Sequence, residues 1–328
     1  MRRAESLRLI LWLSIGPVLA LLALDRAVVC WDAHWAWAAR EVPPLTLDPY
    51  RLEATLRSTP PGRRNVVILG NSVAEMGFDR EALESRFRAE GLRFPKLTIG
   101  GAPAASFGML ARAVAGLEPR TVVYVAAAPA LRSRDFLDHV YSYDVRAAPA
   151  LFTPAEWLAE PRFHLEGLAG QLHVLARHRR ALQRALLVRL GRLSWEGLRL
   201  QAERIRLEHG LEGRDAFQEW VSQEPDRYPN PNTRALAHLA RTLRAAGASL
   251  VVLDAPVHPI LMKLGIRERV ARYRSLLREL AEAEGFAWLD AEQLPRLAEH
   301  EFLDWIHAND RGRERLTGFL GDHLAAGP

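Results

Sequence analysis

The chain has 328 residues, of which 49% are hydrophobic and 25% charged, the proportions of one large folded domain or two modest ones. This composition excludes disorder as the main state. The single cysteine, Cys30, excludes an intrachain disulfide, a four-thiolate zinc site and a cysteine-held iron–sulfur cluster. The formal charge is +5, and only Lys96 and Lys263 are lysines, so the other 42 of the 44 basic residues are arginines. This bias is typical of a GC-rich genome, and we expect no nucleic-acid partner.

The N-terminal segment is typical of a membrane anchor or a signal peptide. A head with three arginines precedes Leu9–Leu24, an uncharged run of 16 residues that is somewhat shorter than the roughly 20 needed to span a bilayer. A cleaved signal peptide is the alternative, but no clean small-x-small cleavage site follows the run. We therefore expect an uncleaved anchor over residues 1–31, with Trp31, Trp35 and Trp37 near the outer membrane interface. The positive-inside rule then places the rest of the chain in the periplasm or outside the cell.

Residues 32–63 are rich in prolines and predict a stalk or linker without a core of its own. The folded domain is expected to occupy residues 64–328.

Five apolar runs in this domain predict buried strands, and most are followed by helical patterns. The runs lie at residues 64–70, 96–99, 120–125, 249–253 and 286–290. Strands that alternate with helices favour right-handed crossovers and a mainly parallel sheet covered on both faces. The sequence therefore predicts a three-layer α/β/α domain around a five-stranded sheet.

One segment interrupts this alternation. More than a hundred residues separate the third and fourth runs, and many show helical spacing with an arginine-rich face. Because this is too long for one crossover helix, we expect a helical insertion at about residues 150–215. Its basic face predicts either a solvated surface or a contact with anionic lipid or an acidic partner.

Candidate catalytic residues lie near both ends of the domain. Ser72 follows the first strand directly after Gly70-Asn71, where an open α/β sheet places its ligand loops. This serine could equally be a helix cap. Near the C-terminus, Asp304 precedes His307 by three residues in a loop. That spacing lets the carboxylate bind one ring nitrogen while the other faces a hydroxyl.

With these motifs in that order, the chain resembles the SGNH/GDSL hydrolase superfamily. The likeness covers about residues 64–326, and its specific parts are Leu69-Gly70-Asn71-Ser72 and Asp304-x-x-His307. The membrane segment, the insertion and the phrase from Val252 to Pro259 are similar to an extracytoplasmic branch that includes alginate O-acetylation proteins and the D-alanine transfer protein of teichoic acids. The resemblance implies a serine esterase or acyltransferase in which Ser72, His307 and Asp304 form the triad.

Three departures from the family pattern affect this interpretation. Asn71 stands where the family usually has aspartate, which the chemistry tolerates. The family's oxyanion glycine aligns with Gly101 or, in a second register, with Gly100. The family's asparagine after the third strand is absent, a loss that would cost about 10²–10³ in rate unless a group such as Ser133 or Arg134 replaces it.

Rival sites are weaker. His300 and Glu301 begin a pattern like that of zinc proteases, but Asp304 stands where the second histidine should be, so we expect no metal. The phosphate-binding and dinucleotide-binding glycine motifs do not occur, and we expect no cofactor. His258 is interpreted as a structural loop residue, with a pocket-lining role as the alternative.

The sequence thus predicts an extracytoplasmic, membrane-anchored serine esterase or O-acyltransferase. Its expected substrate is an acyl ester, with acetyl the expected acyl group, of a cell-surface or exported glycan, and a membrane-bound O-acyltransferase is a possible partner. The alternative is a degenerate member of the fold that docks a polymer or an acyltransferase without chemistry.

Overall fold

In the computed structural model, the fold is built on five parallel strands in the order β2-β1-β3-β4-β5. The structure describes residues 15–17, 19–20, 22–28, 30–43, 48–126, 144–172, 174–197, 229–263 and 267–326. The strands are β1 (Val66–Gly70), β2 (Lys96–Thr98), β3 (Thr121–Ala126), β4 (Ser249–Asp254) and β5 (Ala287–Leu289). The predicted parallel five-stranded sheet is therefore confirmed.

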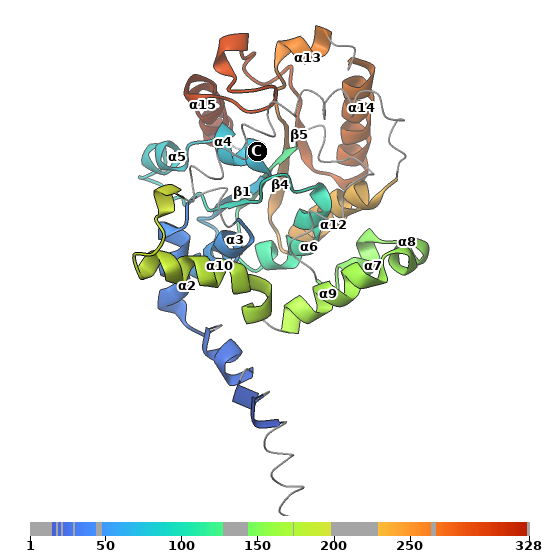
Figure 1. The fold of residues 1–328 in the computed structure, drawn as a ribbon. Coiled ribbons are helices and arrows are strands. Elements are labelled where there is room, and N and C mark those ends of the chain that lie inside the picture. Colours follow the sequence, from blue (N-terminus) through green and yellow to red (C-terminus); the bar gives the residue numbers. More distant parts are fainter. Residues whose placement is uncertain are drawn as a thin grey trace, which may run out of the picture.

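Helices cover both faces of this sheet (Figure 1). One face packs on α6 (Ala104–Ala115), α12 (Pro231–Ala245) and α14 (Arg267–Glu284). The other packs on α4 (Ser72–Gly77), α5 (Arg80–Arg86) and α15 (Asp310–Ala326). All residues of β1 and β3 are buried, because helices on both faces leave no polar side to these strands. The three-layer prediction holds.

Local sequence signals place several helix starts. Asp79 caps α5 by accepting a hydrogen bond from the Ala82 amide, as the sequence predicts. Asn230 and Thr233 form a capping box at the start of α12.

The N-terminal region contradicts the expected stalk over residues 32–63. Helices α2 (Asp32–Glu41) and α3 (Asp48–Ser58) pack against each other around a core of their own. Trp35, expected at a membrane interface, is fully buried in that core together with Tyr50. Leu52 of α3 joins the main core, so the folded unit begins before residue 64. The helical periodicity of residues 32–58 outweighs the prolines, which lie at the helix boundaries.

The segment between β3 and β4 is helical where it is described. It contains α7 (Ala148–Leu151), α8 (Pro154–Ala159), α9 (Pro161–Leu172) and α10 (Val174–Arg189). Helix α10 packs on the pair of helices α2 and α3, which we call the N-terminal hairpin. Leu182 borders the core of this hairpin, and the Arg189 guanidinium lies 4.5 Å from the Trp37 ring centre. Residues 198–215 of the expected insertion lie outside the described residues.

Two short helices complete the description: α13 (Pro259–Lys263) follows β4, and the 3₁₀ turn η2 (Glu299–Glu301) precedes α15. Among the described residues, the helices are too short or too polar to cross a bilayer. Residues 1–14, which include much of the expected anchor, lie outside the described part of the chain.

Candidate active site

The strand order places the end of β1 at a favourable point for a ligand. The chain passes from β1 to β2 on one side and then returns to β3 on the other, so the order reverses beside β1. In open α/β sheets, ligands bind beyond the carboxyl ends of strands at such a switch point. Ser72 lies two residues beyond the end of β1.

A tight turn presents the Ser72 side chain. Gly70 has a φ of +156°, and a Cβ added there would lie 2.8 Å from the Ala74 Cβ and 3.0 Å from the Val125 carbonyl oxygen. Asn71 is the N-cap of α4, and its side chain accepts a hydrogen bond from the Val73 amide at 3.0 Å. The cap role therefore belongs to Asn71, which leaves the Ser72 hydroxyl free to bind elsewhere.

The structure brings Ser72, His307 and Asp304 together. Ser72 Oγ lies 2.8 Å from His307 Nε2, although the two residues are 235 positions apart. His307 Nδ1 lies 2.6 Å from Asp304 Oδ2. A hydrogen-bonded chain of hydroxyl, imidazole and carboxylate can make a serine nucleophilic, because the imidazole accepts the hydroxyl proton.

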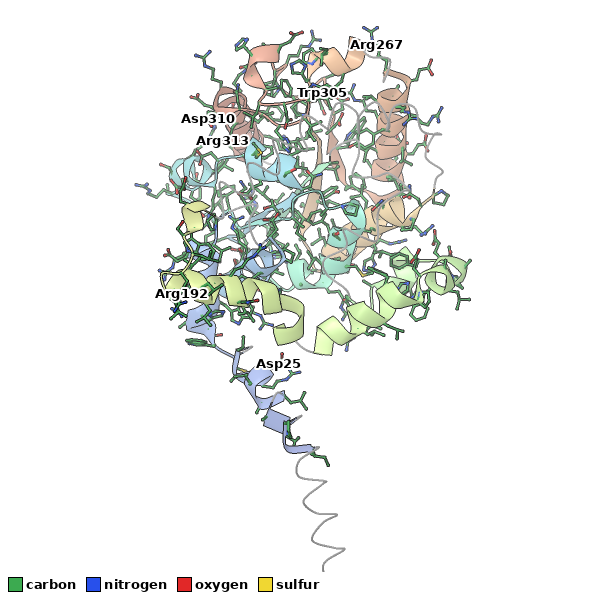
Figure 2. The ribbon with its side chains drawn as sticks, in the orientation of Figure 1. Asp25, Arg192, Arg267, Trp305, Asp310 and Arg313 are labelled. Carbon is green, nitrogen blue, oxygen red and sulfur yellow. The ribbon has the colours of Figure 1, made fainter. Side chains whose placement is uncertain are left out.

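Backbone contacts fix the loop that holds Asp304 and His307. The Leu303 amide donates to the His307 carbonyl at 2.8 Å, and Phe302 forms an antiparallel bridge with Ala308. Asp304 Oδ1 accepts from the amides of Ile306 and His307 at 2.9 and 2.8 Å. In Figure 2 the label of Trp305 marks this loop, near the end of the sheet where α4 lies.

These contacts also determine the charge of Asp304. Burial alone would raise the pKa of this carboxyl group, but the hydrogen bond with the His307 ring and those from the two amides outweigh burial and lower the pKa below its usual value. Asp304 is therefore an anion at neutral pH and can accept a hydrogen bond from Nδ1 of His307.

The two glycines expected at an oxyanion hole differ in their contacts. The Gly100 amide donates to Asp48 Oδ2 at 2.7 Å, so this amide is engaged by the first turn of α3. Gly101 follows with a φ of +68° and is exposed. An amide that is already engaged is less available to an oxyanion, so the register with Gly101 stays our prediction. Ser133 and Arg134 lie outside the described residues.

The rival residues have other partners. Glu301 pairs with Arg315, whose Nη1 lies 2.6 Å from Oε2, and Asp304 binds His307. The His258 amide donates to the Trp305 carbonyl at 2.9 Å, and its ring meets Phe302 edge-on at 5.3 Å. His258 thus supports the loop that holds Asp304 and His307, which agrees with its interpretation as a structural loop residue.

Sequence reasoning missed a buried polar network behind the nucleophile. Glu75 of α4 accepts a hydrogen bond from Thr98 Oγ1 at 2.5 Å, and its carboxylate lies 3.3 Å from Lys96 Nζ and 3.4 Å from Arg51 Nη1. Lys96 Nζ also donates to the carbonyls of Glu75 and Phe78 near the end of α4. One signal was present in the sequence: Lys96 is a lysine in a chain that otherwise uses arginine almost throughout.

Comparison with known proteins gives distant structural likenesses. No protein-family model matches the chain, and no curated protein matches it. TesA aligns with a TM-score of 0.42 and 15% identity, covering 80% of this chain and 98% of that one. LAE5, an α/β hydrolase from the metagenome of Lake Arreo, aligns at 0.43 and 14%, covering 81% and 95%. A mutant of Axe2, an acetyl-xylooligosaccharide esterase from Geobacillus, aligns at 0.40 and 10%, covering 80% and 93%. All three alignments have TM-scores below 0.5 and identities of 15% or less.

Proposed function

We propose that this chain is a serine esterase or O-acyltransferase in which Ser72 is the nucleophile, His307 the general base and Asp304 the residue that orients the imidazole. The observation that supports the proposal is the unbroken chain of contacts from Asp304 Oδ2 through His307 to Ser72 Oγ, at 2.6 and 2.8 Å. These are the distances that proton transfer from a serine hydroxyl requires.

The reaction follows from this geometry. His307 Nε2 takes the hydroxyl proton as Ser72 Oγ bonds to the acyl carbonyl carbon, and the amides of Ser72 and Gly101 are assigned to the resulting oxyanion. His307 then gives the proton to the leaving alcohol oxygen as the ester bond breaks, which leaves an acyl-serine. A water molecule or a sugar hydroxyl, deprotonated by His307, takes the acyl group and restores Ser72.

A fluorophosphonate probe tests the nucleophile, because it phosphonylates activated serines. We expect it to label the wild-type chain and not Ser72→Ala. Ser85→Ala is the matched control, since Ser85 is exposed on the neighbouring helix α5, and it should label like the wild type. A folded, detergent-solubilised chain that does not react would contradict the proposal and favour a binding protein without chemistry.

The role of Asp304 has its own test. Asp304→Asn should preserve folding and lower turnover of a small acetyl ester by about 10⁴, because the amide favours the wrong imidazole tautomer. His307→Ala should lose at least as much, and adding Ser72→Ala to either variant should change little, since the three groups act as a unit. Independent, multiplying losses would contradict this assignment.

We also propose that the chain is anchored in the membrane through residues 1–31, with the catalytic domain outside the cytoplasm, and that its ester substrate is an acylated glycan of the cell surface. The arginine-rich head and the apolar run that follows it support the anchor. A reporter fused after residue 328 should be active only outside the cytoplasm, and intact-mass measurement should find residues 1–31 retained. A mature chain that lacks them would disprove the anchor.

A further inference from the structure

A pocket whose lining does not include Ser72 lies along the β2 edge of the sheet. It has a volume of about 360 Å³ and is formed by α2, α3, the start of α5 and the segment that leads into β2. Figure 1 shows these elements together at the side of the molecule where the blue N-terminal helices meet the sheet. We call it the edge pocket.

Positive charge dominates the lining of the edge pocket. Its charged lining residues are Arg40, Arg51, Arg80, Arg93, Lys96 and Glu84. Even in an arginine-rich chain, five cations to one anion within one cavity is a strong excess. The cavity concentrates a positive potential because the protein walls screen charge less than water does.

The cations differ in how far their charge is already balanced. Arg80 pairs with Glu84, whose Oε1 lies 2.8 Å from its Nε. Arg51 and Lys96 share Glu75 behind the pocket wall. Within the described part of the chain, Arg40 and Arg93 have no carboxylate partner.

Arg93 carries a second sign of an unmet interaction. Its Nη2 donates to the Pro60 carbonyl at 3.2 Å, which fixes one side of the guanidinium. Its Nε is buried and has no hydrogen-bond partner among the described residues. Because this Nε is buried, a ligand in the pocket would meet the guanidinium of Arg93 through its other donors.

We propose that the edge pocket binds a phosphate group, held by Arg93, Arg40 and Arg51. A phosphate carries up to two negative charges near neutral pH and offers several acceptor oxygens, which suits a cluster of guanidinium forks better than a single carboxylate does. The volume admits a phosphate with a small organic body attached. Lys96 contributes charge from behind, since its ammonium is committed to α4.

The phosphate could belong to a soluble molecule or to a lipid headgroup, and two measurements separate these sources. The full chain in neutral detergent is titrated with inorganic phosphate by calorimetry at constant ionic strength. In a second arm it is titrated with micelles that contain short-chain phosphatidylglycerol, with phosphatidylcholine micelles as reference. Saturable binding in the first arm identifies a soluble phosphate, and binding only in the second identifies a headgroup.

Variants tie the binding to the pocket. Arg93→Gln should weaken phosphate binding at least tenfold, and Arg40→Gln, an exposed position that is safe for folding, should weaken it severalfold. Arg272→Gln is the matched control, because Arg272 is exposed on α14, away from the pocket, and it should bind like the wild type. Absence of saturable binding in both arms, or equal weakening by Arg272→Gln, would overturn the proposal. These binding measurements do not involve Ser72, so they test the phosphate site independently of the proposed esterase activity.

Discussion

Gly70 determines where the Ser72 hydroxyl lies. Gly70→Ala places a methyl group against Ala74 and the Val125 carbonyl, at a φ that alanine rarely adopts. We expect a loss of about 1–3 kcal/mol in stability and a much slower reaction with a fluorophosphonate, because the turn must shift. Gly318→Ala is the control, since that helical glycine has open space around it and its substitution should be neutral or stabilising. Wild-type labelling by Gly70→Ala would show that the turn does not position the serine.

Asp254, at the end of β4, gives the fold a pH dependence. Burial raises the pKa of this carboxyl group to about 6, although the Arg274 guanidinium at 2.8 Å acts in the opposite direction. Because the folded-state pKa exceeds the ordinary value, the contribution of this group to stability is complete below about pH 4 and is lost as the pH rises through about 6.

The corresponding prediction compares the wild type with Asp254→Asn in thermal and urea unfolding between pH 4 and 7. The wild type should lose up to about 3 kcal/mol relative to the variant over this range, since each pKa unit corresponds to about 1.4 kcal/mol. In Arg274→Gln the window should move to higher pH, because the cation that opposes the shift is gone. If the stabilities of the wild type and Asp254→Asn changed in parallel with pH, the raised pKa of Asp254 would be refuted.

At the scale of elements, helix α4 depends on Lys96. The helix has only six residues, too few to be stable alone. The Lys96 ammonium binds the carbonyl and the side chain of Glu75 and the carbonyl of the C-cap residue Phe78. Burial opposes the charge on Glu75, but Lys96, Arg51 and the Thr98 hydroxyl lower the pKa of Glu75 below its usual value.

Lys96→Met should therefore cost about 3–5 kcal/mol in urea unfolding, because it leaves the buried Glu75 carboxylate with less compensation. Lys96→Met combined with Glu75→Gln should cost less than the sum of the single losses. The exposed pair Arg313 and Asp310, labelled in Figure 2, is the comparison: Arg313→Met should cost about 1 kcal/mol or less. Strict additivity for Lys96 and Glu75 would mean that the two do not interact.

Asp48 connects α3 to the proposed oxyanion turn. Its carboxylate accepts from the Gly100 amide and so restricts the backbone next to Gly101. We expect Asp48→Ala to lower kcat on a small ester about tenfold or more with little change in KM, because the turn becomes less ordered. Asp48→Asn keeps an acceptor oxygen and should retain most of the activity. Equal losses in both variants would assign Asp48 a role other than positioning the turn.

The elements show which features local sequence can predict. The five strands can be predicted from sequence because each is a short apolar run between turn signals. The contact between Asp304 and His307 can be predicted because the two residues are close in sequence. The contact of Ser72 with His307 follows from the strand ends meeting at one edge of the sheet. The pairing of Lys96 with α4 and of Asp48 with Gly100 depends on tertiary packing that leaves no periodic trace. For that reason the sequence alone does not choose between Gly100 and Gly101.

For the whole molecule, the N-terminal hairpin is part of the fold. Helix α3 packs against β2, the edge strand of the sheet, and its Leu52 lies in the same core cluster as Leu97 of that strand. Tyr50 Oη lies 2.6 Å from His34 Nε2 within the hairpin core. The prolines here predict a linker from sequence alone, whereas they bound two packed helices, of which α3 contacts the edge strand β2.

Trp35→Ala tests whether the N-terminal hairpin is part of the fold. A fully buried tryptophan should cost about 3–5 kcal/mol in global unfolding when truncated, whereas a residue in a stalk should cost about 0.5 kcal/mol or less. Trp31→Ala is a matched control, because that tryptophan is half exposed and should have a much smaller effect. A single cooperative transition that shifts with Trp35→Ala would establish that hairpin and sheet unfold together.

The separation of Ser72 and His307 along the chain has a consequence for biosynthesis. A ribosome adds the serine 235 positions before the imidazole that activates it. Throughout that interval the nascent chain displays an ordinary alcohol, inert toward esters that it meets while it is being made or moved. In the proposed mechanism, a competent site forms only when the loop of Asp304 and His307 is in place beside the β1 turn. A chain that ends before that loop is therefore expected to be inactive rather than partly active.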